Sequence, residues 1–273
     1  MIGWTLVGAL VAGYLISHDG VQKIAAWAGE QLTIERLSLY ITVGGGLLGA
    51  AAVLLVAARL WGRPGGWLIA LYNVITLLLI GLIYNTMFMV DTEAIHFPQY
   101  ALLGMLLLPR TGRVTEAITW VTLFGAFDEA WQYWVLNMGN RVDSVYFDFN
   151  DIVLNLAGGA FGVLLALALL ADNVDAASDG YSWRDYVRST AFRTTAAFVA
   201  AGGALWLAGR LTLFPDPSAW IVLARTGPRP AYWETSYWGK TTHVLLPLEG
   251  LPLIAALLAL YLPLDRRLRL RLD

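Results

Sequence analysis

Cysteine is absent from the 273 residues of the chain, and only 14% of the residues are charged. Without cysteine the chain forms no disulfide, zinc–thiolate site or catalytic thiol. An average soluble domain has about 25% charged residues, so this deficit argues against an ordinary soluble domain. The chain has only three histidines and a net charge of −2, which exclude a His-rich metal cage and offer no electrostatic basis for binding nucleic acid.

Apolar residues are abundant instead, at 58% of the chain with a mean hydropathy of +0.61. They gather in about eight runs, and crossing a bilayer takes about 20 residues per helix. The runs are 1–17, 37–60, 67–90, 95–109, 115–136, 151–171, 191–213 and 241–263. Because backbone groups in lipid must be satisfied internally, we expect an all-α, polytopic transmembrane bundle in the cell membrane. The fourth run is short and fits a half-buried or re-entrant helix, and the first has no basic residue before it, as expected for a retained span.

Basic residues predict the orientation of this bundle. If the N-terminus is cytoplasmic, the inner loops hold Arg59, Arg63, Arg110, Arg113, Arg184, Arg188, Arg193, Arg266, Arg267, Arg269 and Arg271. The outer loops then hold fewer, namely Lys23, Arg36, Arg141, Arg225, Arg229 and Lys240. The positive-inside rule therefore predicts that both termini are cytoplasmic.

Glycines recur at spacings that favour close helix packing. The stretch "GGGLLG" at 44–49 matches a dinucleotide-binding pattern, but it lies inside an apolar run and no strand precedes it. The pairs Gly45/Gly49 and Gly158/Gly162 have the spacing of membrane helix contacts. We interpret both pairs as packing positions.

Polar residues occur where these runs should be apolar, in "DTEAIHFPQY", "FDEAWQYW" and "NRVDSVYFDFNDIVLNLAGG". The helical period places Glu93, His96 and Tyr100 on one face, Asp128 and Gln132 on another, and Asp151 and Asn155 on a third. Glu129 directly follows Asp128 in the chain. Arg141 lies in the loop with which the third stretch begins. The topology puts all three sets in the outer half of the membrane, so we expect His96 to lie within reach of Asp128 or Glu129.

Two interpretations account for acids at this depth, where each costs about 2.5–3.5 kcal/mol at a span centre. In the first, a polar clamp pairs Asp128 or Glu129 with Arg141. In the second, the acids form a site, because Glu93, Asp128, Glu129 and Asp151 outnumber the available cations. Such a site suits a cationic ligand. Mg²⁺ or Ca²⁺ could bind the oxygen ligands of Asp128, Glu129 and Asp151, although no cofactor is predicted.

Taken in order, these motifs resemble the VanZ-like membrane proteins, which are associated with teicoplanin resistance. The resemblance rests on Glu93 with "HFPQY", on "DEAWQ", on Arg141 and on "DIVLNLAGGAFG", and it covers roughly residues 67–171. It implies a four-helix core at 67–171, preceded by two helices at 1–66 and followed by two helices and an aromatic outer loop at 172–273. It also implies a role at the cell envelope.

Three functions remain open from the sequence. The chain could bind an envelope lipid or an amine-bearing ligand on the outer side. It could be a membrane enzyme acting on a lipid-linked substrate, with Glu93 or Asp128 as base, His96 as acid or base and Arg141 holding a phosphate. It could also be a structural subunit of a larger membrane complex. In each case we expect membrane lipids as partners.

Overall fold

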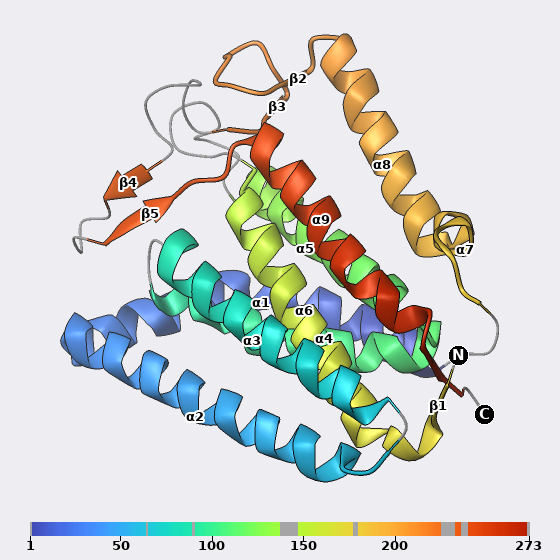
Figure 1. Cartoon of the computed structure of the whole chain (residues 1–273). Coiled ribbons are helices and arrows are strands. Elements are labelled where there is room, and N and C mark those ends of the chain that lie inside the picture. The colour runs from blue at the N-terminus through green and yellow to red at the C-terminus, as the bar shows by residue number, and fades with distance from the viewer. Residues whose placement is uncertain are drawn as a thin grey trace.

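The structure is a computed structural model that describes residues 2–63, 65–88, 91–136, 147–176, 180–224, 233–235 and 240–271. Its helices are α1 (Ile2–Gln31), α2 (Ile34–Leu60), α3 (Gly66–Met87), α4 (His96–Thr111), α5 (Val114–Trp131), α6 (Phe149–Leu169), α7 (Trp183–Arg188), α8 (Thr190–Leu207) and α9 (Pro247–Asp265). A 3-10 helix precedes α4 (η1, Asp91–Ile95), a π-helical turn extends α5 (η2, Gln132–Leu136), and a second 3-10 helix follows α6 (η3, Ala171–Asn173). Figure 1 shows the arrangement.

Six short strands form three two-stranded pairs outside the helices. They are β1 (Val174–Ala176), β2 (Leu211–Thr212), β3 (Ile221–Val222), β4 (Trp233–Thr235), β5 (Thr241–His243) and β6 (Leu268–Leu270). β1 pairs with β6 and β4 with β5, both antiparallel, while β2 and β3 are parallel. The sequence analysis did not predict these strands, because two or three residues are too few to show an alternating pattern.

Each predicted apolar run contains one long helix, and the mostly helical fold is confirmed. Among the described residues, four helices are long and apolar enough to cross a membrane, namely α2 from Glu35, α3, α6 and α9. The helices differ from the runs mainly at their ends. The first helix continues to Gln31 rather than ending near 17, because the polar residues after Ser17 change its hydropathy without breaking its backbone hydrogen bonds.

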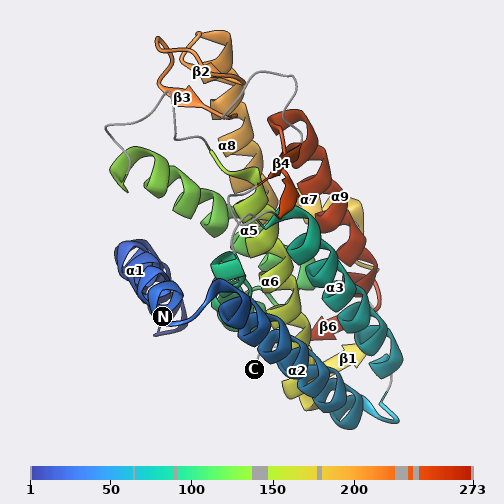
Figure 2. The same cartoon turned by 90° about the vertical axis from the view of Figure 1, so that its left-hand side faces the viewer.

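Helix α6 is the centre of the bundle, with 83% of its most apolar window buried. Figures 1 and 2 show α6 between α3, α5 and α9, while α8 lies at the edge against α5. The other membrane-length helices are much more exposed, and only 11% of the corresponding window of α2 is buried. The exposed side chains of α2 are large and apolar, including Leu47 and Leu48, as expected for a surface that faces lipid.

Glycines allow α4 and α6 to pack with their backbones in contact. A Cβ atom at Gly162 would overlap the Ala101 carbonyl, and one at Gly158 would lie 2.7 Å from the Phe97 oxygen. On the facing helix, a Cβ at Gly104 would overlap the Gly159 carbonyl. The packing role predicted for Gly158 and Gly162 therefore has a clear structural basis, since no larger residue fits at this crossing.

No comparable contact is made at Gly45 among the described residues. A Cβ there would meet no atom of the described residues within 4 Å, and one at Gly49 would make an ordinary contact with Leu77 at 3.5 Å. The glycine spacing is equal in both helices, but α2 does not cross a neighbour at Gly45. Spacing alone does not determine which helix face is used.

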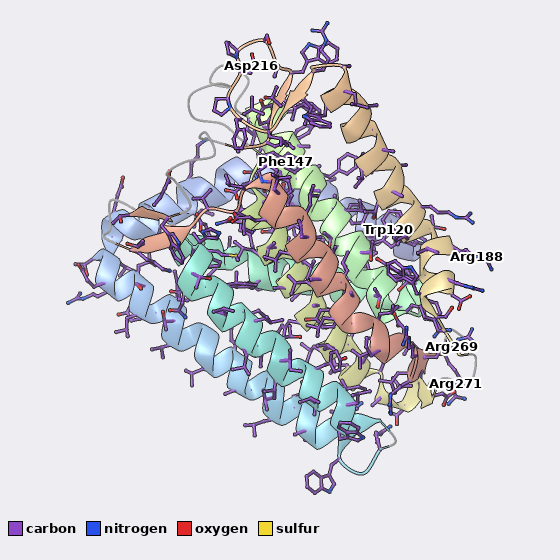
Figure 3. The ribbon with its side chains drawn as sticks, turned by 45° about the horizontal axis from the view of Figure 1, so that its top comes forward. Trp120, Phe147, Arg188, Asp216, Arg269 and Arg271 are labelled. Atoms are coloured by element: carbon purple, nitrogen blue, oxygen red, sulfur yellow. The ribbon has the colours of Figure 1, made fainter. Side chains whose placement is uncertain are left out.

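Arginine side chains gather at one end of the bundle, which we call the basic end. It comprises the α2–α3 connection, β1, β6, α7 and the ends of α4, α6 and α9 (Figure 1). Arg63 contacts Asp172 at 2.8 Å and holds the pKa of that carboxyl below its usual value. Figure 3 shows Arg188, Arg269 and Arg271 on this side of the molecule.

The opposite end, which we call the cap end, is organised by Asn150 near the start of α6. Its side-chain nitrogen donates to the carbonyls of Met87, at 3.0 Å, and His243, at 2.8 Å. Its side-chain oxygen accepts from the Leu245 amide at 2.8 Å. Because Asn150 joins α3 and β5 to α6, it fixes the position of the first turn of α6, which carries Asp151.

Candidate functional site

The polar residues of the three motifs meet where α4, α5 and α6 come together at the cap end. His96 is the first residue of α4, Asp128 and Glu129 lie in the last turn of α5, and Asp151 and Asn155 lie in the first two turns of α6. All of them are buried or nearly so. We call these five residues, with Tyr100 and Gln132, the polar cluster.

His96 links α4 to α6. Its Nδ1 lies 2.8 Å from Asn155 Oδ1, so Nδ1–H donates and Nε2 faces the other way, 3.8 Å from Asp151 Oδ2. The sequence analysis named Asp128 or Glu129 as the carboxylate beside this ring. The carboxylate within ion-pair distance of the ring is Asp151, on the helix that α4 crosses with its backbone in close contact.

Asn155 is fully buried, and its position depends on a glycine in α5. A Cβ at Gly125 would lie 2.9 Å from both Cβ and Nδ2 of Asn155. The amide therefore reaches the turn of α5 that leads to Asp128 and Glu129. Its Nδ2 has no hydrogen-bond acceptor among the described residues, which is unusual for a buried donor.

Tyr100 joins the next pair of helices. Its hydroxyl donates to Asp128 Oδ2 at 3.2 Å, from α4 to α5. Its ring stacks on His96 with a centroid distance of 6.2 Å, and Tyr14 of α1 approaches it at 5.8 Å. Neighbouring aromatic rings thus already flank the Tyr100 ring.

Glu129 is buried, with 3% of its surface exposed. Gln132 Nε2 donates to its Oε1 at 2.9 Å, across the point where α5 becomes π-helical. The carboxyl groups of Asp151, Asp148 and Asp128 each lie within electrostatic range of Glu129. Burial of several like charges together is costly, which marks the cluster as a candidate functional site.

Asp148 belongs near this cluster, although the sequence analysis did not include it. It caps α6 by accepting from the amide nitrogens of Asn150, at 2.8 Å, and Asp151, at 3.4 Å. The sequence signal was present, because an aspartate directly before an apolar helix is a typical N-cap.

Two residues that the sequence predicted for this site, Glu93 and Arg141, are not among the residues of the polar cluster. Glu93 is half-buried in η1, outside α4, so the helical face predicted for it begins only at His96. Arg141 lies outside the described residues. The predicted pairing of Arg141 with Asp128 or Glu129 therefore stays a prediction.

A narrow crevice lies beside the cluster, between α1, α4 and α5. It has about 170 Å³ of empty volume, is too tight for a water molecule, and is lined by Val11, Tyr14, Leu15, Tyr100, Leu103, Phe124 and Asp128. Within the described ranges, no three histidine or acidic residues are grouped to hold one metal ion. The geometry of the described residues thus offers hydrogen-bond acceptors to a ligand rather than a ready coordination sphere.

Fold and cluster together describe a mostly helical protein whose described residues include four helices long and apolar enough to cross a membrane, with a carboxylate-rich polar cluster at one end of the bundle. Comparison of the chain with protein-family models, curated proteins and solved structures gave no match.

Proposed function

We propose that this protein is a VanZ-like integral membrane protein that binds a cationic, amine-bearing ligand of the cell envelope at the polar cluster. The observation that carries the proposal is that two acids of the cluster have few hydrogen-bond donors around them. Glu129 Oε2 receives no hydrogen bond from the described residues, and Asp151 has only the His96 ring, at 3.8 Å. Carboxylate oxygens held in this way gain most from a ligand that brings positive charge and N–H donors.

The contacts within the cluster support the resemblance on which the family proposal rests. Two pairs of motif residues from different helices are in contact, namely His96 with Asn155 and Tyr100 with Asp128. The glycines of the third motif make the closest helix crossing. A motif set whose members touch in space is a better candidate for one functional unit than separate local features.

We further propose about eight spans with both termini in the cytoplasm, which places the cluster on the outer side. The arginines of the basic end lie at the opposite end of the bundle from His96 and Asp151 (Figures 1 and 3). The positive-inside rule assigns such an end to the cytoplasm. A ligand would then reach the cluster from the outer leaflet or from the space beyond it.

The proposal can be tested with the purified full-length protein in detergent. Phosphatidylethanolamine carries an amine and phosphatidylglycerol does not, so we expect the first to be retained in native mass spectra and to raise the melting temperature more. Glu129→Gln and Asp151→Asn should abolish this preference while the variants stay folded. Glu116→Gln is the control, because Glu116 bonds to Tyr181 at the basic end.

The clamp interpretation predicts a different result. If the acids only hold the helices together, both variants should melt several degrees lower without any lipid, and the wild type should show no preference between the two headgroups. That pair of observations would overturn the binding proposal.

A structural subunit of a larger membrane complex is the second candidate, and the surface of α2 favours it. Only 11% of the apolar window of α2 is buried, which leaves a long apolar face available to a partner helix. Cross-linking in native membranes through a photoreactive residue at Leu48 distinguishes the possibilities. A discrete protein adduct would support the subunit function, and lipid adducts alone would reject it.

A further inference from the structure

The hydrogen-bonding capacity of the polar cluster narrows the class of ligand. Glu129 Oε2 and both oxygens of Asp151 are acceptors without a hydrogen bond from the described residues. His96 adds another, because its Nδ1–H donates to Asn155 and its Nε2 is left as an acceptor toward Asp151. The cluster therefore offers several acceptors to one ligand group.

A quaternary ammonium would not use these acceptors, because it has no N–H to donate. Proteins recognise such groups with the open faces of aromatic rings. Two rings beside the cluster already have ring partners: Tyr100 stacks on His96 and approaches Tyr14, and Phe97 stacks on Phe88 at 5.4 Å. Tyr100 and Phe97 therefore do not present open faces to a quaternary ammonium.

Asn155 supplies an observation that does not depend on the acids. Its side chain is fully buried, and Nδ2 has no acceptor among the described residues. Nδ2 lies against Gly125, one turn before Asp128 and Glu129 in α5, so it faces the same region as the acids. A ligand oxygen close to the ammonium would satisfy this donor.

We infer that the cluster selects a primary ammonium with a neighbouring oxygen atom, the chemistry of an ethanolamine phosphate headgroup, over a quaternary ammonium. The inference rests on the proposed function and specifies the ligand class of the same site. A primary ammonium carries three N–H donors, which suits the acceptors that Glu129, Asp151 and His96 bring to the cluster. Each methyl group added to the nitrogen removes one donor, and a charge-assisted hydrogen bond contributes about tenfold in affinity.

The test uses the full-length protein and lipids with identical acyl chains. Phosphatidylethanolamine, its N-methyl and N,N-dimethyl derivatives and phosphatidylcholine are compared with phosphatidylglycerol by native mass spectrometry and by thermal shift. Soluble O-phosphoethanolamine forms a separate arm, which distinguishes a free ligand from a lipid headgroup. We expect retention to fall stepwise with methylation, and phosphatidylcholine to bind at least tenfold more weakly than phosphatidylethanolamine.

The outcomes separate this inference from the proposed function. Equal binding of phosphatidylethanolamine and phosphatidylcholine, both above phosphatidylglycerol, would overturn the inference and leave the proposed function standing. No preference for either over phosphatidylglycerol, with no effect of O-phosphoethanolamine, would overturn both. Because the methylation series uses the wild-type chain, the result does not depend on whether a variant folds.

Asn155→Leu tests the role of the unpartnered amide. We expect it to reduce the discrimination between phosphatidylethanolamine and phosphatidylcholine, because both the hold on His96 and the donor Nδ2 are lost. Glu116→Gln should leave the discrimination unchanged, since its contact with Tyr181 lies at the other end of the bundle. Unchanged discrimination in folded Asn155→Leu would remove Asn155 from the site.

Discussion

Replacing Gly162 by alanine tests the packing on which the polar cluster depends. The new Cβ would overlap the Ala101 carbonyl oxygen and lie 2.6 Å from the Ala101 Cα, so it would meet backbone rather than a flexible side chain. Since backbone atoms cannot change rotamer, α4 and α6 must separate. We expect Gly162→Ala to destabilise the protein even though alanine is the better helix former.

The magnitude follows from two opposing effects. Overpacking a tight interior costs about 1–3 kcal/mol, and alanine in place of glycine within a helix gains up to about 1 kcal/mol. The net loss at Gly162 should be about 1–2 kcal/mol. Gly45→Ala is the matched control, because its Cβ meets nothing within 4 Å among the described residues and only the helix-forming gain remains.

Thermal denaturation in detergent measures the difference between the two variants. A loss of about 1–2 kcal/mol corresponds to a melting temperature lower by roughly 2–8 °C for a chain of this size. Gly45→Ala should melt at or slightly above the wild-type temperature. If both variants melt alike, the close approach of α4 and α6 is not what stabilises this crossing, and the argument from Gly162 fails.

Two further predictions concern the ends of the bundle. Asp265 of α9 accepts from the amides of Val114, at 2.6 Å, and Thr115, at 2.8 Å, so it caps α5 from another helix. Charge-assisted bonds contribute about 1.5–3 kcal/mol each, so loss of both in Asp265→Ala should lower the unfolding free energy by about 3–6 kcal/mol, and Asp265→Asn should lower it by about half as much. Equal denaturation curves for wild type and Asp265→Ala would contradict this. For topology, Ser218→Cys at the cap end should react with an impermeant maleimide in intact cells and Arg184→Cys at the basic end should not, and the reverse pattern would invert the proposed orientation.

Local chemistry made the helical framework predictable from the sequence. Each apolar run became a helix because a backbone in lipid must satisfy its own hydrogen bonds, whatever its neighbours are. The ends were less predictable: α1 continues to Gln31, since a change from apolar to polar residues does not itself stop a helix. The polar motifs also stood out in the sequence, because acids within apolar runs are visible without any knowledge of packing.

Only the tertiary structure decided which of these features meet. Gly45 and Gly162 share one spacing, yet one faces open space and the other a helix backbone. Topology placed His96 near the acids of α5, but its 3.8 Å contact with Asp151 depends on the tight crossing of α4 on α6. Helical period fixes the face on which a residue lies, whereas its partner depends on how two helices dock. That docking is set by contacts between segments far apart in the chain, which a local sequence pattern does not contain.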